Sequence, residues 1–338
     1  MTRLRRPSAT TAGAISASAA LCFALVGGSV SPALAATTPT PSTSRGTTVA
    51  AAPSRDQAAT PTTSAASAAK PGAVPTPAPT PAPAPITPVV TGITKHLGNT
   101  ASVRTAALTG THLGHVARVL VGGVVAADLT LVGSKRVTFL IGTAPNFQAT
   151  TVPISVVTDT GVTLPTTLSY SWKVRTKRDR EMAYAGVNWN ATKNARFGYL
   201  PGSDCTNFVS QLLLARGWLQ SAQWWNTYST TRTWSATWAS VTAMSDWLGT
   251  RPDLATHLLY RDRNQAVVGD IIQINWDGVG AGKLWEHSAV VSRVDIEPDG
   301  THDIYYTAHS TNRLYGGSLY WLVKGYKHIR IQFWHLNT

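Results

Sequence analysis

One of the two cysteines in the chain stands where a protein would place a nucleophile. The segment from Gly202 to Leu214 predicts a helix, with Asp204 as its capping residue and Cys205 in its first turn. The free N–H groups and the positive dipole end of a first turn favour a thiolate, which attacks carbonyl carbons, and they can hold the resulting oxyanion. A small buried cysteine on a core helix is the structural alternative, and the polar neighbours of Cys205 argue against it.

A thiol nucleophile needs a base within hydrogen-bond reach, and two histidines are candidates for its partners. His287 precedes an apolar strand and is the predicted general base. His309 ends a later strand and is the predicted orienting residue, with Asn312 and Asp303 as alternatives. No closely spaced ligand pair accompanies these residues, so neither a metal nor another cofactor is expected.

Tryptophans crowd the part of the chain that follows the predicted cysteine helix. Aromatic faces stack on sugar rings and on peptide groups, although most buried tryptophans are ordinary core residues. Polar residues flank Trp224, Trp225 and Trp285, so these three are predicted to be exposed and to bind substrate.

The N-terminus indicates export. Arginines at positions 3, 5 and 6 precede an uncharged stretch over residues 12–30 and a small-x-small site at residues 33–35, which predicts a signal peptide over residues 1–35. A membrane anchor is the weaker alternative because the stretch is rich in Ala, Gly and Ser. Cys22 lies inside the signal, so the mature chain has one thiol, and exported proteins seldom keep one without a reason. We therefore expect a secreted, extracellular or wall-associated protein without stable membrane insertion.

Composition divides the rest of the chain into three parts. Residues 36–85 are rich in Pro, Ala and Thr and predict an extended linker. Residues 86–172 alternate short β-branched runs with turn residues, which predicts an all-β sandwich. Residues 173–338 show helical patterns first, including 178–194, 206–215 and 235–248. Strand patterns follow, including 270–276, 288–294, 304–308 and 319–323, which is an α+β order.

The charge favours anionic partners. The formal net charge is +13 and remains +10 without the three arginines of the predicted signal. An exported basic protein is attracted to anionic wall polymers, and the chain shows no nucleic-acid motif. The oligomeric state is not determined by the sequence, and a monomer is the simplest expectation.

Residues 86–172 resemble an IPT/TIG domain, an immunoglobulin-like module that serves as a spacer or a binding domain. The resemblance rests on short motifs spread over the region, at residues 108–113, 119–123, 154–161 and 168–170. It implies two packed sheets and no catalysis in this region.

Residues 173–338 resemble the family described as a "putative amidase domain", which is related to NlpC-like and CHAP cell-wall peptidases with a papain-like plan. The matching motifs follow the family's order, at residues 204–211, 234–241, 269–273, 286–291 and 308–310. The resemblance implies Cys205 as nucleophile, His287 as base and His309 as the third residue. It also implies that Asp270 is structural. The family's Asn-Pro-x-Tyr-like element is replaced here by Asn194-Ala-Arg-Phe197.

The sequence therefore predicts a cysteine-dependent amidase or peptidase that hydrolyses amide bonds, with peptidoglycan as the expected substrate. A transferase that uses the same acyl-enzyme is indistinguishable at this level. The alternative from a different class is a non-catalytic protein that binds wall polymers and carries a relic of an active site.

Overall fold

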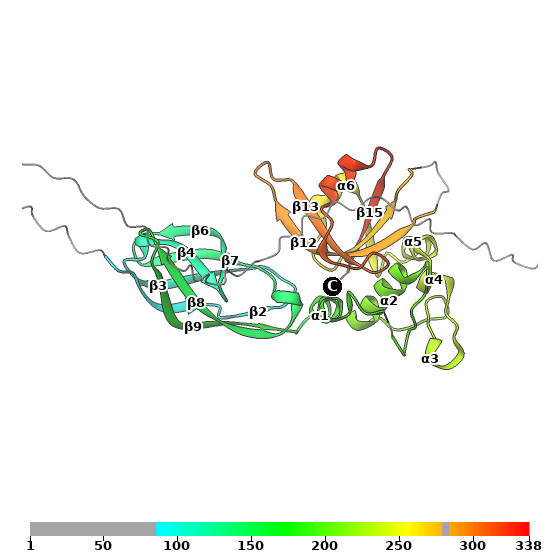
Figure 1. Cartoon of the computed structure of the whole chain (residues 1–338), viewed down its shortest axis with the longest axis horizontal. Coiled ribbons are helices and arrows are strands. Elements are labelled where there is room, and N and C mark those ends of the chain that lie inside the picture. Colours follow the sequence, from blue (N-terminus) through cyan, green and yellow to red (C-terminus); the bar gives the residue numbers. More distant parts are fainter. Residues whose placement is uncertain (1–85, 193, 279–283, 338) are drawn as a thin grey trace, which may run out of the picture. The chain divides into compact units, whose positions relative to one another are not determined.

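The computed structural model describes residues 86–192, 194–278 and 284–337 (Figure 1). The predicted signal peptide over residues 1–35 and the linker over residues 36–85 lie outside the described residues. Within the described ranges, no helix is both long and apolar enough to cross a membrane.

The N-terminal described region consists of two sheets that share one core. The first sheet has the order β1 (Val89–Thr94), β3 (Arg104–Thr111), β7 (Arg136–Ile141), β6 (Ala127–Val132). The second has the order β2 (Leu97–Asn99), β9 (Thr163–Lys173), β8 (Thr150–Thr158), β4 (Val116–Val121), β5 (Val124–Val125). Leu108 and Phe139 from the first sheet pack with Val119, Ile154 and Tyr170 from the second, because alternate strand residues point into the core.

The C-terminal region is mixed α/β. Its antiparallel sheet has the order β10 (Ala255–Leu259), β15 (Arg330–Leu336), β11 (Ile271–Asn275), β12 (His287–Ile296), β13 (His302–Ala308), β14 (Arg313–Gly316). The longer helices are α1 (Lys177–Asn188), α2 (Asp204–Arg216), α5 (Val241–Gly249) and α6 (Leu319–Gly325). Two single turns are α3 (Tyr228–Thr231) and α4 (Ala236–Ala239).

Helices cover both faces of the six-stranded sheet. On one face, α1, α2 and α5 pack against side chains such as Ile271 and Val290. On the other face, α6 packs through Leu319 against Ile274 and Ala289. Figure 1 shows α6 on the opposite side of the sheet from α1 and α2. The alternation of β12 therefore assigns each of its side chains to one of two different layers.

Two predicted elements differ from the structure. The apolar run over residues 319–323, predicted as a strand, is helix α6, whose start is capped by Ser318 through a bond from Trp321 N. Its apolar residues Leu319, Leu322 and Val323 follow helical spacing, which a five-residue window does not resolve. The helix predicted over residues 235–248 is interrupted at Ser240, which has extended backbone and caps α5.

Asp270 has the structural role that the sequence predicted for it. Its carboxylate is buried and accepts a hydrogen bond from Val267 N at 2.9 Å, and it contacts His335 Nδ1 at the same distance. It fixes the turn that leads into β11.

A buried cluster joins the two regions, which belong to one compact unit. Phe147 lies in the turn that follows β7 and packs with Phe208 and Leu212 of α2. Close to it, α1 crosses the same turn at Gly186, where a Cβ atom would lie 1.9 Å from the carbonyl oxygen of Asn146. Only glycine permits that approach.

Asp179 adds a polar connection to this cluster. Its carboxylate accepts hydrogen bonds from Ala101 N at 2.8 Å and from Thr176 N at 2.8 Å. Those bonds lower its pKa, although burial works in the opposite direction and is the largest single influence. Asp179 thus caps α1 and binds the first region with the same side chain.

We predict that Phe147→Ala destabilises both regions together. The side chain is fully buried, and truncating a buried phenylalanine costs about 3–5 kcal/mol. Thermal unfolding should show one transition at a lower Tm, while Val125→Ala, at an exposed position, should leave Tm unchanged. A loss confined to the β-sheet region would contradict the shared cluster.

Candidate active site

Helix α2 is buried along most of its length. Phe208 and Leu212 face one cluster, and Val209 and Leu213 face another, so the predicted apolar face is in fact two faces. The N-cap residue is Ser203, whose side chain makes no capping hydrogen bond. The prediction that Asp204 caps the helix is therefore wrong: Asp204 is the first helical residue.

The carboxylate of Asp204 instead fixes the loop that leads into α2. One oxygen accepts hydrogen bonds from Leu200 N at 3.1 Å and from Asn207 Nδ2 at 2.8 Å. The other lies 2.7 Å from Nδ1 of His309, which follows β13. Three separate segments thus meet at one buried carboxylate, directly beside Cys205.

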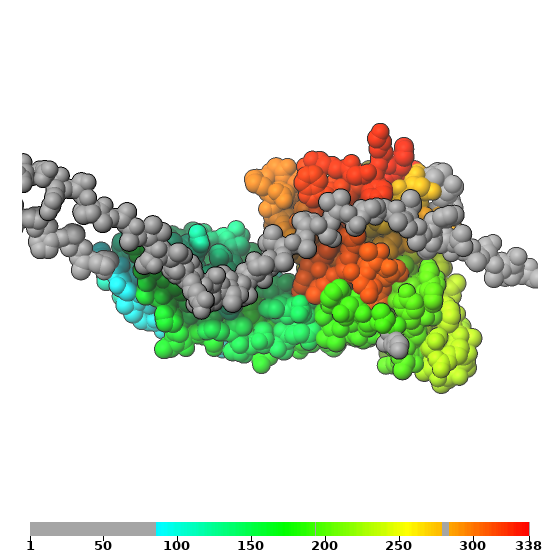
Figure 2. Space-filling view, in the orientation of Figure 1, coloured from blue at the N-terminus to red at the C-terminus, as the bar shows by residue number. Residues whose placement is uncertain are grey.

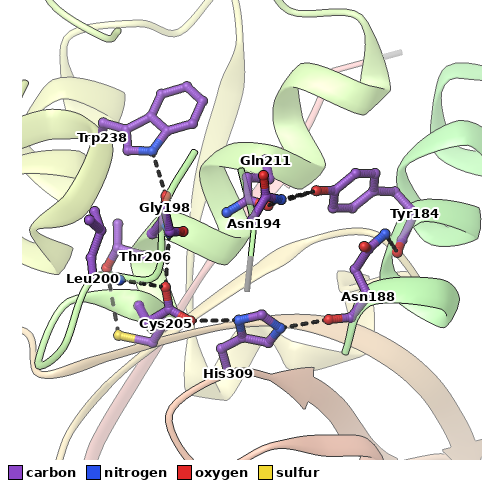
Figure 3. A network of polar contacts seen from close by, with 12 residues as sticks. Tyr184, Asn188, Asn194, Gly198, Leu200, Cys205, Thr206, Gln211, Trp238 and His309 are labelled. Carbon is purple, nitrogen blue, oxygen red and sulfur yellow. Dashed lines mark hydrogen bonds and ion pairs between the residues drawn. The ribbon is translucent and has the colours of Figure 1, made fainter. Parts of the chain in front are cut away.

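His309 is held by acceptors at both ring nitrogens. Nδ1 faces the Asp204 carboxylate, and Nε2 lies 2.7 Å from the carbonyl oxygen of Asn188 at the end of α1 (Figure 3). A carbonyl oxygen only accepts, so Nε2 carries a proton. The two hydrogen bonds from Leu200 and Asn207 reach one oxygen of the carboxylate, and Nδ1 of His309 faces the other. The ring also stacks on Phe208, with centroids 4.0 Å apart.

This arrangement gives His309 a role other than the predicted one. With both ring nitrogens engaged by Asp204 and Asn188, His309 has no nitrogen left to bind His287. The alternative third residues, Asp303 and Asn312, are not placed to orient His287 either. Asp303 accepts from Ser318 at the start of α6, and Asn312 is exposed.

The other polar residues of the cysteine motif also have structural partners. Asn207 accepts from Trp238 Nε1 at 2.8 Å, and Gln211 accepts from Tyr184 OH at 2.6 Å. Asn194, from the segment that departs from the family pattern, donates to the same Gln211 oxygen. Figure 3 shows this network continuing from His309 toward Gln211 and Trp238. The case for catalysis therefore rests on Cys205 rather than on the polarity of its neighbours.

Cys205 lies at the end of the sheet where β12 begins. Its side chain is 4 % exposed, and Sγ is 3.8 Å from Thr206 Oγ1. Thr206 donates in turn to Ser288, the second residue of β12, at 3.4 Å. Figure 2 shows the orange surface of the later strands meeting the green surface of the first helices.

His287 is the first residue of β12 and lies on the other face of the sheet. It pairs with Ile274, and its ring contacts Trp276 and Tyr306, with centroids 6.2 and 6.3 Å away. Its neighbour Ser288 is the residue that points to α2. The structure thus brings the predicted nucleophile and base to one sheet end, but directs the imidazole toward Trp276 and Tyr306.

The surroundings keep His287 in its neutral form. Burial is the main cause and the positive charge of Arg313 the second, and together they lower the pKa of His287 from 6.5 to about 4. A neutral imidazole has a free lone pair and can accept a proton. The state that a general base requires is therefore present at any pH above about 5.

The three predicted substrate-binding tryptophans differ in exposure. Trp224 is fully buried and donates to Ser210 of α2, so its predicted exposure is wrong. The aromatic stretch after α2 fills the core instead. Trp225 is half-buried. Trp285 is half-buried and lines a groove of about 390 Å³, whose other walls include Tyr260, Val323, Ile329 and Arg330.

Trp321 is the most exposed of the aromatic residues that the sequence did not single out. It lies on α6 and is 67 % exposed, and the Lys324 ammonium lies over its ring. Its segment was predicted as a strand, which concealed the face it occupies. Elsewhere among the described residues, no group of three or more acidic, histidine or cysteine side chains is placed to hold a metal ion.

The comparison with protein families supports an amidase domain. Residues 175–334 match the family model described as "Putative amidase domain". The match covers the C-terminal mixed α/β region, from the start of α1 to β15, and it indicates amide-bond hydrolysis. No curated protein matches the chain.

Solved structures resemble the chain only distantly. Two come from Bacteroides ovatus: the mixed-linkage glucan utilization locus protein SGBP-B (17 % identity, 23 % of this chain and 20 % of that one, TM-score 0.19) and an auxiliary nutrient binding protein (16 %, 25 % and 21 %, TM-score 0.19). A third, from Bacteroides thetaiotaomicron, is titled a putative phosphatase (14 %, 65 % and 48 %, TM-score 0.20). The chain spans about a fifth of the length of the first two.

We predict that the folded protein loses stability in acid, because folding keeps His287 neutral. The unfolded chain binds the proton near pH 6.5 and the folded chain near pH 4, so stability falls as the pH drops through this window. The free energy of unfolding should fall by up to ~3 kcal/mol between pH 7 and pH 4, and His287→Gln should flatten that part of the profile. A titration of the His287 ring by NMR with a midpoint near 6.5 would refute the assignment.

We also predict that the Asp204–His309 pair is essential to stability. Both side chains are almost completely buried, and removal of one partner from such a pair costs about 3–5 kcal/mol. Denaturant unfolding of His309→Ala should show this loss, against no change for His96→Ala at an exposed position. A loss below about 1 kcal/mol would mean that the pair does not hold α2.

Proposed function

We propose that the chain is an exported cysteine-dependent amidase that cleaves amide bonds in cell-wall peptide, with Cys205 as nucleophile and His287 as base. The carrying observation is the position of Cys205. It lies in the first turn of an uncapped helix, within the region that matches an amidase family, beside the sheet end where His287 stands. That setting provides N–H groups for a thiolate or an oxyanion.

The proposed reaction proceeds through an acyl-enzyme. The neutral imidazole of His287 takes the thiol proton as Sγ attacks the amide carbon, and first-turn N–H groups of α2 stabilise the oxyanion. The C–N bond then breaks, and the imidazolium returns the proton to the leaving amine. His287 next deprotonates a water, which hydrolyses the thioester to a carboxylic acid and restores the thiol.

This step requires a movement of the base. The ring of His287 contacts Trp276 and Tyr306, whereas Cys205 belongs to the helix on the other face. Because His287 is the first residue of β12, rotation about its side-chain bonds can carry the ring around the sheet end toward Sγ. Catalytic hydrogen bonds often form only when the substrate is bound.

The finer fold assignments belong to the same proposal. A helix that presents a cysteine at its start to a strand that begins with a histidine supports a papain-like plan for residues 173–338. Two sheets around a common core support an IPT/TIG-like, immunoglobulin-like module for residues 86–172. His309 acts here through Asp204, as a clamp on the nucleophile helix.

Export and the wall substrate rest on the sequence. The signal-like residues 1–35, the proline-rich residues 36–85 and the positive charge suit an enzyme that works among anionic wall polymers. A second candidate function is binding of wall polymer without catalysis. The Trp285 groove and the exposed Trp321 favour it, because aromatic faces bind sugars.

We predict that Cys205→Ala abolishes the release of new amine ends from purified peptidoglycan. Loss of the nucleophile removes the acyl-enzyme route, so the rate should fall by at least about 10³-fold. Mass analysis of the released peptides would identify the bond, and circular dichroism would show that the variant is folded.

Thr206→Ser is the matched control, because it keeps the hydroxyl beside Cys205 and should retain activity. Equal release by Cys205→Ala and the original chain would end the enzyme hypothesis. Binding to the wall without any release would favour the second candidate.

A further inference from the structure

Three neighbouring strands of the C-terminal sheet begin or end at the same end of the sheet. β12 begins with His287, β13 ends at Ala308, and β14 begins with Arg313, which pairs with Ala308. Ala308 belongs to the same buried layer as Tyr306, and the ring of Tyr306 contacts His287. Arg313 therefore stands on the face of the sheet that also carries His287.

The stem of Arg313 lies against Gly316, and the residue itself is exposed. Its side-chain carbons lie 2.9–3.2 Å from the position that a Cβ atom on Gly316 would occupy. The next residue, Gly317, has a positive φ and would bring a Cβ atom within 2.5 Å of the Tyr306 ring. The two glycines allow the turn of β14 to close over Tyr306, with the guanidinium 6.0 Å from its ring centre.

Within residues 86–192, 194–278 and 284–337, no carboxylate forms an ion pair with this guanidinium. Among the described residues, every ion pair involves other arginines or histidines. The nearest acidic residue in sequence to His287 is Glu286, and its carboxylate accepts from Trp276 N. The positive charge of Arg313 nevertheless disfavours protonation of His287, and so it contributes to the lowered pKa of that ring.

We propose that Arg313 binds a carboxylate of the substrate, so that the enzyme prefers amides whose peptide carries an acidic group close to the scissile bond. The inference rests on the proposed function and specifies its substrate class. A guanidinium offers paired N–H donors that match a carboxylate, and the exposed position of Arg313 leaves those donors accessible. Arg313 is thus a specificity-determining residue.

Binding of such a carboxylate also acts on the base. A substrate anion beside Arg313 offsets the positive charge that disfavours the imidazolium of His287, while the burial contribution remains. Other groups that face the ring are Tyr306 from β13 and Trp276 after β11, and neither carries a charge at neutral pH. The correct substrate would therefore strengthen the base that acts on it.

The activity test compares two forms of one substrate. Purified peptidoglycan is used as isolated and after conversion of its free carboxylates to amides with carbodiimide and ammonium. The full chain should cleave the amidated form about 10- to 100-fold more slowly, and Arg313→Gln should cleave both forms at that reduced rate through a raised KM. Arg136→Gln, an exposed arginine on β7, is the charge-matched control and should behave as the original chain.

Gly316→Ala separates the position of the guanidinium from its charge. The added methyl group displaces the Arg313 stem, so the preference for the carboxylate form should weaken while the charge is kept. Gly325→Ala, where a Cβ atom meets nothing within 4 Å, is the matched control. An unchanged preference in both Arg313→Gln and Gly316→Ala would overturn the inference and leave the proposed amidase intact.

A binding test does not depend on catalysis. The His287 ring signals are followed by NMR while N-acetylglutamate, or its diamide as a control without any carboxylate, is added to the full chain carrying Cys205→Ala. The glutamate derivative should shift these signals, and the added change Arg313→Gln should remove the effect. No shift with the glutamate derivative, or equal shifts with both, would refute the carboxylate site whatever the activity assay shows.

Discussion

Asp204 and His309 form a buried ion pair, and the position of the nucleophile helix depends on it. The pair joins the first residue of α2 to the end of β13 at 2.7 Å, and the opposite nitrogen of the ring reaches the end of α1. A buried charge pair is tolerated only when its remaining hydrogen-bonding positions are filled, and here Leu200 and Asn207 fill them. Because Cys205 is the next residue of α2, the same pair also fixes its position at the end of the sheet.

Buried hydrogen bonds of this kind also explain why the cysteine motif is so polar. A helix buried on both sides would usually be apolar throughout, yet Asn207 and Gln211 lie inside it without exposure. Each binds a partner from another element, which orients α2 in more ways than apolar packing alone would do. A polar motif around a cysteine is therefore weak support for catalysis, since its polarity serves the position of the helix.

The sheet separates two kinds of chemistry. On the face of α2, charges are paired inside the protein, as in Asp204 and His309. On the face of His287, the imidazole is neutral and the cation of Arg313 has no internal carboxylate partner among the described residues. Arg313 is exposed, so its guanidinium is accessible to an external anion at this end of the sheet. The two regions of the chain share the cluster in which Phe147 packs with Phe208 and Leu212 of α2.

The sequence by itself determined most of the elements and the candidate residues, with α6 and the break at Ser240 as exceptions. Strand alternation marked the N-terminal sheets, Gly217 marked the end of α2, and the order of motifs indicated Cys205 at a helix start, because these signals are local. Only the tertiary structure decided what each side chain faces. It paired His309 with Asp204 across 105 residues, buried Trp224, and turned α6 into a helix that packs on the sheet. Such contacts join segments that are distant in the chain, and the facing of His287 follows from a strand register that a one-residue shift would reverse.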